Sequence, residues 1–199
     1  MFGILLVAII AYLIGNFSTS YILGKHLKNV DIRTKGSGNA GATNALRVLG
    51  KKIALLTFLI DAFKGILAVI IGQLIIQDTG GLIAGIFVVI GHNWPFILKF
   101  KGGKGIATTI GAATFINPLP AIIAIILGIL IIIKTKYVSL GSVSAMALVP
   151  FLYLLVESPF QIKYFIFFLI LSIMAVYKHK SNINRLIKGE ESKLGQKAR

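Results

Sequence analysis

Three short segments of the sequence combine glycines with cations, hydroxyls and amides. They read DIRTKGSGNAGATNALR at residues 31–47, FKGGKGIATT at residues 100–109 and HKSNINRLIKGEE at residues 179–191. Glycine permits backbone turns that other residues avoid, so several N–H groups can converge on one anion, while lysine and arginine supply the opposite charge. The three segments therefore indicate that the protein binds phosphate groups.

The first segment suggests a helix directed at the anion. Thr43 or Asn44 is expected to cap a helix that runs through Arg47 into the next apolar stretch, so that the positive helix end points at the site. The alternative is a flexible linker. Linkers rarely hold serine, asparagine, threonine and arginine at such density, which favours the binding loop.

The second segment is suited to an oxyanion. Gly102 and Gly103 would let the backbone approach it closely, and Lys104 would place a charge at the start of a helix near Gly105. The segment differs from a Walker A loop, because no serine or threonine follows Lys104 and the spacing of the glycines is different.

Two further patterns in the first segment are interpreted as accidental. Residues 36–41 match G-x-G-x-x-G, but VDIRTK precedes them where a dinucleotide site needs a buried strand. His26 and Asp31 match the H-x4-D pattern of one class of acyltransferases, and such a pair arises easily by chance.

The composition is that of an integral membrane protein. Hydrophobic residues make up 56% of the chain and charged residues 14%, against about 25% charged in an average soluble protein. The sequence has no cysteine and only six acidic residues, which argues against disulfides, thiolate nucleophiles, paired carboxylates and a protein-built metal site. We therefore expect neither a metal nor a cofactor.

The apolar stretches predict an all-α membrane protein with seven spans. Each span needs about 20 apolar residues. The N-terminal stretch lacks a basic flank and a clear cleavage site, and is interpreted as a retained span. Residues 105–133 are too long for one span and are divided at Asn117–Pro120 into two short ones. The remaining predicted spans are residues 3–24, 53–76, 80–98, 137–156 and 160–178.

The basic residues predict the orientation. With the N-terminus outside and the C-terminus in the cytoplasm, seven spans place every lysine and arginine on the cytoplasmic side except Lys64 and Lys163. One span at residues 105–133 would put the basic tail outside and is rejected, whereas a five-span model with a re-entrant hairpin stays open. We treat residues 1–199 as a single transmembrane domain in which residues 189–199 form a flexible tail. For most of these basic residues, the simplest interpretation is that they only set the orientation of the chain in the membrane.

Several polar residues lie within predicted spans. Asn16, Ser18, Thr19 and Ser20 are expected to face the interior of the bundle. Asp61 and Lys64 are spaced to pair on one helix face, and a structural ion pair beside the site is favoured over direct substrate contact. His92 is interpreted as a satisfied buried histidine.

In its three motifs, present in order, the chain resembles the membrane glycerol-3-phosphate acyltransferases that use acyl phosphate, the bacterial PlsY family. The resemblance implies transfer of a fatty acyl group from acyl phosphate to the 1-hydroxyl of sn-glycerol 3-phosphate. The products would be lysophosphatidic acid and phosphate, in the first step of bacterial phospholipid synthesis. It also implies a seven-helix fold whose site opens to the cytoplasm of a bacterial inner membrane.

Site residues are assigned on this resemblance. His179, Lys104 and Arg47 are the candidate catalytic residues, and His179 and Asn182 are expected to orient glycerol phosphate. No covalent nucleophile stands out, and the base can be His179 or a substrate phosphate. The residues expected to bind phosphate are Ser37, Gly38, Asn39, Thr43, Arg47, Gly102, Gly103, Lys104 and Ser142.

The expected partners are small molecules and lipid. They are acyl phosphate, glycerol 3-phosphate and the membrane, with no nucleic acid and no obligate protein partner. An alternative is a transporter or channel for a phosphorylated solute, because glycine-broken segments and cations also line anion pathways. A structural scaffold is a third reading, and it predicts that replacing Gly102 and Gly103 by alanine is harmless.

Overall fold

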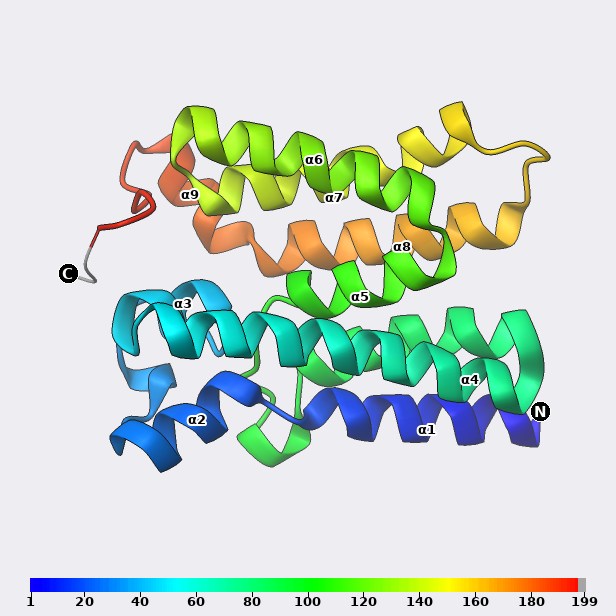
Figure 1. Ribbon diagram of the computed structural model, residues 1–199, viewed down its shortest axis with the longest axis horizontal. Helices are drawn as coiled ribbons and strands as arrows, with labels where there is room; N and C mark the ends of the chain where they lie inside the picture. Colours follow the sequence, from blue (N-terminus) through cyan, green and yellow to red (C-terminus); the bar gives the residue numbers. More distant parts are fainter. Residues whose placement is uncertain (197–199) are drawn as a thin grey trace. The chain divides into compact units, whose positions relative to one another are not determined.

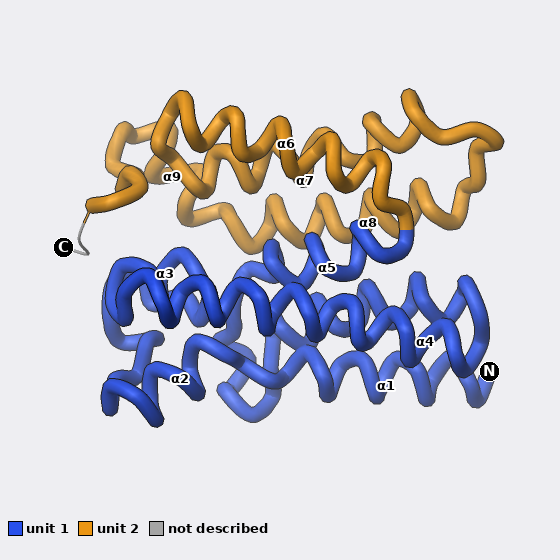
Figure 2. The backbone as a smooth tube through the Cα atoms, viewed as in Figure 1, with its two compact units in different colours: residues 1–116, 197–199 blue, residues 117–196 orange. Residues whose placement is uncertain are grey.

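The chain forms helices throughout the part that the structure describes. The structure is a computed structural model, and it describes residues 1–196. Every regular element in these residues is a helix, which confirms the all-α prediction. The described chain divides into two compact units, residues 1–116 and residues 117–196 (Figure 2). The assignment of residues 1–199 to one domain stays a prediction.

Unit 1 contains the first two glycine-rich segments. In it α1 packs along the long helix α4, which also packs against α5 (Figure 1). Its elements are α1 (Phe2–Asn16), α2 (Thr19–Lys28), the 3-10 helix η1 (Ile32–Thr34), α3 (Ala42–Val48), α4 (Lys51–Asn93), the 3-10 helix η2 (Phe96–Leu98) and α5 (Ile106–Ile116).

Helix α4 is a hairpin of two helical arms. Non-helical dihedral angles at Ile76 and Gln77 break its 43 residues. The arms meet closely, because a Cβ on Gly72 would overlap the carbonyl oxygen of Gly80. The arms correspond to the predicted spans at residues 53–76 and 80–98, and the turn lies where the sequence predicts it.

The first predicted span, residues 3–24, is broken at residues 17 and 18. Helix α1 ends at Asn16, and α2 begins at Thr19 after an extended Ser18. Asn16, Ser18 and Thr19 are all buried, as is Ser20, which confirms that this polar stretch faces the interior. The break leaves backbone carbonyl groups without helical partners, and Lys64 bonds to two of them, as described below.

Small residues bring the helices of unit 1 close together. A Cβ on Gly91 in α4 would overlap the carbonyl oxygen of Tyr12 in α1. A Cβ on Gly111 in α5 would likewise overlap the carbonyl oxygen of Ala62 in α4. Close backbone approach of this kind is typical of helix packing in membranes.

Unit 2 carries the third segment at a bend. Helix α7 packs against both α6 and α8. Helices α8 and α9 meet at an angle of 59°, with His179 at the junction. The elements of unit 2 are α6 (Pro118–Thr135), α7 (Val138–Val156), α8 (Ile162–Lys178) and α9 (Lys180–Ile187).

The helices suit an integral membrane protein. Within residues 1–196, four stretches are long and apolar enough to cross a membrane, or five if α8 and α9 count as one broken span. One of the four, Lys51–Leu98, contains both arms of α4. The predicted break at Asn117 separates α5 from α6. Helix α5, with 11 residues, is short as predicted, whereas α6, with 18 residues, is longer than the short span predicted there.

Part of the predicted flexible tail is bound to unit 2. Glu191 is buried, and the backbone N–H of Leu194 donates to the carbonyl oxygen of Lys136. The flexibility of residues 189–196 stays a prediction, and its continuation through residues 197–199 lies outside the described residues.

Candidate functional site

The side chain of Asn44 holds the first glycine-rich loop in shape. Its Oδ1 accepts from the backbone N–H of Ser37 at 3.0 Å, and its Nδ2 donates to the carbonyl oxygens of Ile32 and Lys35, each at 3.1 Å. Asn44 is 1% exposed. One buried amide therefore joins three points of the loop to helix α3.

The loop uses several of its own backbone N–H groups. Besides the Ser37 bond, the N–H of Gly38 donates to Lys35 O at 3.0 Å, and that of Gly41 donates to Asn39 O at 3.1 Å. These groups are engaged in the loop and differ from the freely converging N–H groups that the sequence suggests. Gly38 instead supplies a left-handed turn, with φ of +70°.

The helix after the loop also differs from the prediction. It starts at Ala42 with Gly41 as N-cap and without a side-chain cap bond, so the predicted capping by Thr43 or Asn44 is wrong. The side chain of Asn44 instead forms hydrogen bonds with the backbone of the loop. The helix does not continue into α4, because Gly50 takes a φ of +93° between them.

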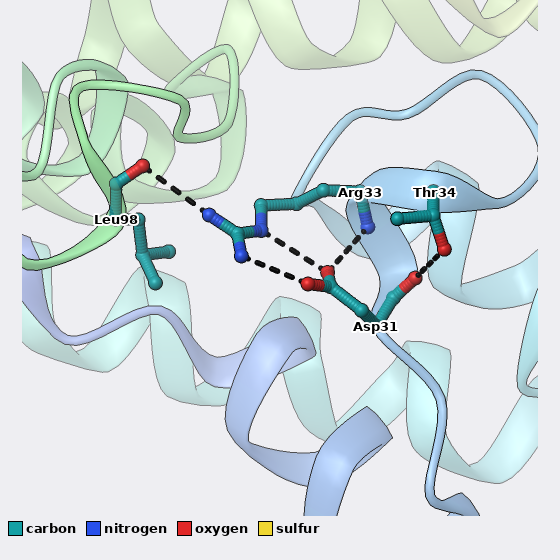
Figure 3. A network of polar contacts seen from close by, with 4 residues as sticks. All are labelled: Asp31, Arg33, Thr34 and Leu98. Atoms are coloured by element: carbon teal, nitrogen blue, oxygen red, sulfur yellow. Dashed lines mark hydrogen bonds and ion pairs between the residues drawn. The ribbon is translucent and has the colours of Figure 1, made fainter.

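Arg33 connects the first loop to the segment before the second loop (Figure 3). Its guanidinium and backbone N–H donate three hydrogen bonds to Asp31, and Nη1 donates to the carbonyl oxygen of Leu98 at 3.2 Å. The guanidinium also lies 4.7 Å from the ring centre of Tyr21. The bond from Arg33 holds the pKa of Asp31 below its ordinary value of 3.8.

The second loop wraps around His92. The N–H of Gly103 donates to the carbonyl oxygen of His92 at 3.1 Å. A Cβ on Gly103 would overlap Nε2 of His92 and lie 2.8 Å from the carbonyl oxygen of Ala40, which belongs to the first loop. A Cβ on Gly102 would overlap the carbonyl oxygen of His92. These glycines are therefore required by packing within the protein, in addition to any role beside an anion.

The predicted phosphate ligands of unit 1 lie on or beside these two loops. Arg47 is in the last turn of α3, and Lys104 lies two residues before α5. Neither cation is buried completely, and Ser37 is exposed. Asn39 and Thr43 are half-buried on either side of Gly41. Unit 1 thus brings the first two segments together, and the binding roles of these residues stay predictions.

Asp61 and Lys64 form a buried ion pair in α4. Lys64 Nζ lies 2.9 Å from Asp61 Oδ1, which also accepts from Thr19 Oγ1 at 2.8 Å. Lys64 donates further to the carbonyl oxygens of Phe17 at 2.7 Å and Gly15 at 3.3 Å, at the break between α1 and α2. The pair therefore compensates for the interrupted helix. That this ion pair supports the binding site stays a prediction.

In unit 2 the third segment is organised by Glu191. Oε1 accepts from Ser139 Oγ at 2.8 Å and from Asn182 Nδ2 at 2.7 Å, and Oε2 accepts from Arg185 Nε at 2.7 Å. Burial raises the pKa of Glu191, but the three hydrogen bonds outweigh it, so the pKa lies below the ordinary 4.5. A charged carboxylate therefore ties α7 to α9.

His179 is buried at the bend between α8 and α9, with 3% of its surface exposed. Its Nδ1 lies 2.7 Å from the carbonyl oxygen of Ala175. Because a carbonyl oxygen only accepts, Nδ1 carries the proton, and in the neutral ring Nε2 holds the lone pair. This tautomer suits a hydrogen-bond acceptor or a general base at Nε2.

Ser142 and Asn182 also lie in unit 2. Ser142 is half-buried in α7, one turn after Ser139, which bonds to Glu191. The bond from Asn182 Nδ2 to Glu191 fixes the orientation of its amide. That these residues share one pocket with Arg47 and Lys104 stays a prediction.

Two residues that organise the site escape the sequence analysis. Glu191 is assigned to a tail, and Asn44 to a helix cap. A signal for Glu191 exists, because carboxylates are scarce in this chain and one placed six residues after Arg185 has an available partner. The loop-forming role of Asn44 has no signal in the spacing, because its three backbone partners lie upstream in irregular structure.

Comparison with known proteins agrees with this arrangement. Residues 5–189 match the family model described as glycerol-3-phosphate acyltransferase. A protein of that name from Alkaliphilus metalliredigens (strain QYMF) is 55% identical over 193 residues, which cover 97% of each chain. One from Clostridioides difficile (strain 630) is 45% identical over 203 residues, covering 99% of this chain and 98% of the relative.

Solved structures are similar as well. A crystal structure of PlsY (YgiH), described as an integral membrane glycerol 3-phosphate acyltransferase in its glycerol 3-phosphate form, matches with a TM-score of 0.89, 33% identity and 96% of each chain covered. Its lysophosphatidic acid form matches with a TM-score of 0.86, 32% identity and coverage of 96% of this chain and 95% of that one. The chain therefore belongs to the glycerol-3-phosphate acyltransferase family.

Proposed function

We propose that this protein transfers a fatty acyl group from acyl phosphate to the 1-hydroxyl of sn-glycerol 3-phosphate. The products are lysophosphatidic acid and inorganic phosphate, at the start of bacterial phospholipid synthesis. The observation that carries the proposal is the similarity, along nearly the whole chain, to a protein crystallised in glycerol 3-phosphate and lysophosphatidic acid forms.

The choice of donor rests on the chemistry that the chain offers. An ordinary ester or thioester needs a well-placed base and an oxyanion hole before it reacts. A mixed anhydride of fatty acid and phosphate already carries a good leaving group, so the protein has only to position it and neutralise its charge. Glycine-rich loops with Arg47 and Lys104 beside them suit this task.

The reaction is a direct attack. The 1-hydroxyl oxygen of glycerol 3-phosphate bonds to the acyl carbonyl carbon, and the bond from that carbon to the phosphate oxygen breaks. Phosphate leaves with the electron pair, and the hydroxyl proton passes to His179 Nε2 or to a substrate phosphate. Arg47, Lys104, Ser37, Asn39, Thr43 and Ser142 bind the phosphates, while His179 and Asn182 orient glycerol 3-phosphate.

The proposed topology places this chemistry at the cytoplasmic surface of the membrane. The chain crosses seven times, through α1, the two arms of α4, α5, α6, α7 and α8, with its N-terminus outside. The distribution of lysine and arginine supports this orientation. Since the chain has no cysteine, a single cysteine placed at position 189 should react with an impermeant thiol reagent only from the cytoplasmic side.

The test of the activity uses purified protein in detergent. It receives palmitoyl phosphate and glycerol 3-phosphate with a chelator and without any carrier protein, and lysophosphatidic acid and phosphate are measured together. Equal amounts of both products are expected, and the protein mass should show no acyl adduct when glycerol 3-phosphate is omitted. Product from palmitoyl-coenzyme A alone would overturn the choice of donor, and no product from either donor would overturn the activity.

A further inference from the structure

We propose that His92 is a positioning residue. It connects the loop at residues 102–105 to the buried Asp61–Lys64 pair, and so determines how Lys104 is presented to a phosphate. The inference rests on the proposed function for the role of Lys104 as a phosphate ligand. The connection itself consists of contacts within unit 1.

The first contact joins Lys64 to His92. Lys64 Nζ lies 2.9 Å from Nδ1 of His92, and both residues are buried, at 4% and 5% exposure. An ammonium group only donates hydrogen bonds, so Nδ1 accepts. With Nδ1 accepting, the neutral ring carries its proton on Nε2, and Asp61 Oδ1 lies 3.8 Å from the same Nδ1.

Lys64 is itself held from several sides. Asp61 Oδ1 is 2.9 Å away and the carbonyl oxygen of Phe17 is 2.7 Å away, while the carbonyl oxygen of Gly15, at 3.3 Å, shares a proton with another partner, because the ammonium has three N–H groups for four acceptors. These partners come from α4 and from the break between α1 and α2. Nδ1 of His92 is therefore attached to a point that the surrounding helices fix in place.

The second contact joins His92 to the loop. The backbone oxygen of His92 accepts from the N–H of Gly103, and the Nε2 edge of the ring lies where a Cβ on residue 103 would stand. The carbonyl oxygen of Ala40, from the first loop, approaches the same position to 2.8 Å. The next residue after Gly103 is Lys104, so a shift of the ring is expected to move the cation directly.

Two substitutions separate the two ends of the ring. In His92→Asn the amide takes the place of Nδ1, keeps an acceptor for Lys64 and removes the ring edge beside Gly103, while the backbone bond between residues 92 and 103 is kept. In His92→Gln the longer amide reaches the place of Nε2, keeps the loop contact and removes the acceptor for Lys64. The matched control is His26→Asn, because His26 is exposed on α2.

The kinetic test compares kcat/KM per folded molecule and the melting temperature. His92→Asn should melt close to wild type and lose at least about tenfold in kcat/KM, since small displacements of a charged group suffice for such losses. His92→Gln should melt lower and keep kcat/KM within about threefold. His26→Asn should change neither. A role in stability alone would lower the folded fraction of both variants and leave their kcat/KM unchanged, which would overturn the proposal.

A second measurement does not depend on catalysis. Amide hydrogen exchange at residues 102–105 should be faster in His92→Asn than in wild type and unchanged in His26→Asn. If the wild type shows no acyl transfer, the proposed function fails while exchange still tests the connection. If His92→Asn does not fold, His92→Gln decides, because a large loss of kcat/KM in its folded molecules would contradict the role of the loop contact.

Discussion

The side-chain nitrogen of Asn182 lies 2.7 Å from Oε1 of Glu191, and both residues are buried. The same oxygen accepts from Ser139, while Oε2 accepts from Arg185. The carboxylate of Glu191, beside the proposed site, thus accepts hydrogen bonds from three side chains of the protein itself. Its task in this account is to orient Asn182 and to join α9 to α7.

Replacing Glu191 by glutamine should impair substrate binding. Glutamine offers one oxygen and one N–H2 group, so at least one of the three present donors would face another donor. We expect the KM for glycerol 3-phosphate to rise by about fivefold or more, because the amide of Asn182 is no longer held in its binding orientation and a lost hydrogen bond costs about 1–3 kcal/mol. Glu190→Gln is the control, since Glu190 is exposed. Equal kinetics for the two variants would argue against the orienting role.

Acid should remove the contribution of Glu191 to stability. Its pKa in the folded protein lies below the ordinary 4.5, so the charged form contributes stability above pH 4.5 and this contribution is lost as the pH falls through the lowered pKa. The difference in melting temperature between wild type and Glu191→Gln should therefore be constant from neutral pH to about pH 5 and shrink below it. A difference that stays constant into acid would contradict the assignment.

The first loop should depend on Asn44 for its shape. Asn44→Ala removes three hydrogen bonds from a buried position, which corresponds to a loss of about 2–4 kcal/mol at about 1 kcal/mol each. We expect a lower melting temperature and proteolytic cleavage within residues 35–41. Asn184→Ala, at an exposed position of α9, should leave both unchanged. If the loop of Asn44→Ala resists proteolysis as well as the loop of the wild type, other contacts hold its shape.

The two cations of unit 1 that are proposed to bind phosphate should matter for turnover more than for folding. Neither Arg47 nor Lys104 is completely buried, so Arg47→Ala and Lys104→Ala should melt near wild type. Each should lose at least about 100-fold in kcat/KM, as expected when a group that stabilises charge in the transition state is removed. Lys28→Ala, an exposed cation of α2, is the control. Near-normal turnover in both variants would mean that the pocket is misplaced.

Regular spacing explains what the sequence predicts correctly. The interval between Asp61 and Lys64 puts them on one helix face, and Pro118 sets the break before α6. Contacts between residues that are far apart in the sequence have no such regular spacing. Lys64 reaches the carbonyl oxygen of Phe17, 47 residues away, because α1 ends at Asn16. The polar residues 16–20 mark this place in the sequence, but their spacing does not show that the helix breaks there.

The glycine-rich loops show the same limit. Their composition predicts an anion site, and the structure adds that Ser37 and Gly38 direct their N–H groups into the loop itself. Gly103 similarly bonds to His92. Which N–H groups remain for a ligand depends on tertiary contacts, so composition alone overstates the number of backbone donors.

The central proposal is that His179 or Asn182 binds the same substrate molecule as Arg47 or Lys104. A crystal structure of the protein with glycerol 3-phosphate tests it most directly. The account predicts one bound molecule whose polar atoms lie about 3 Å from Asn182 or His179 and also from Arg47 or Lys104. A molecule bound by one of these two groups alone, or at neither, would contradict it.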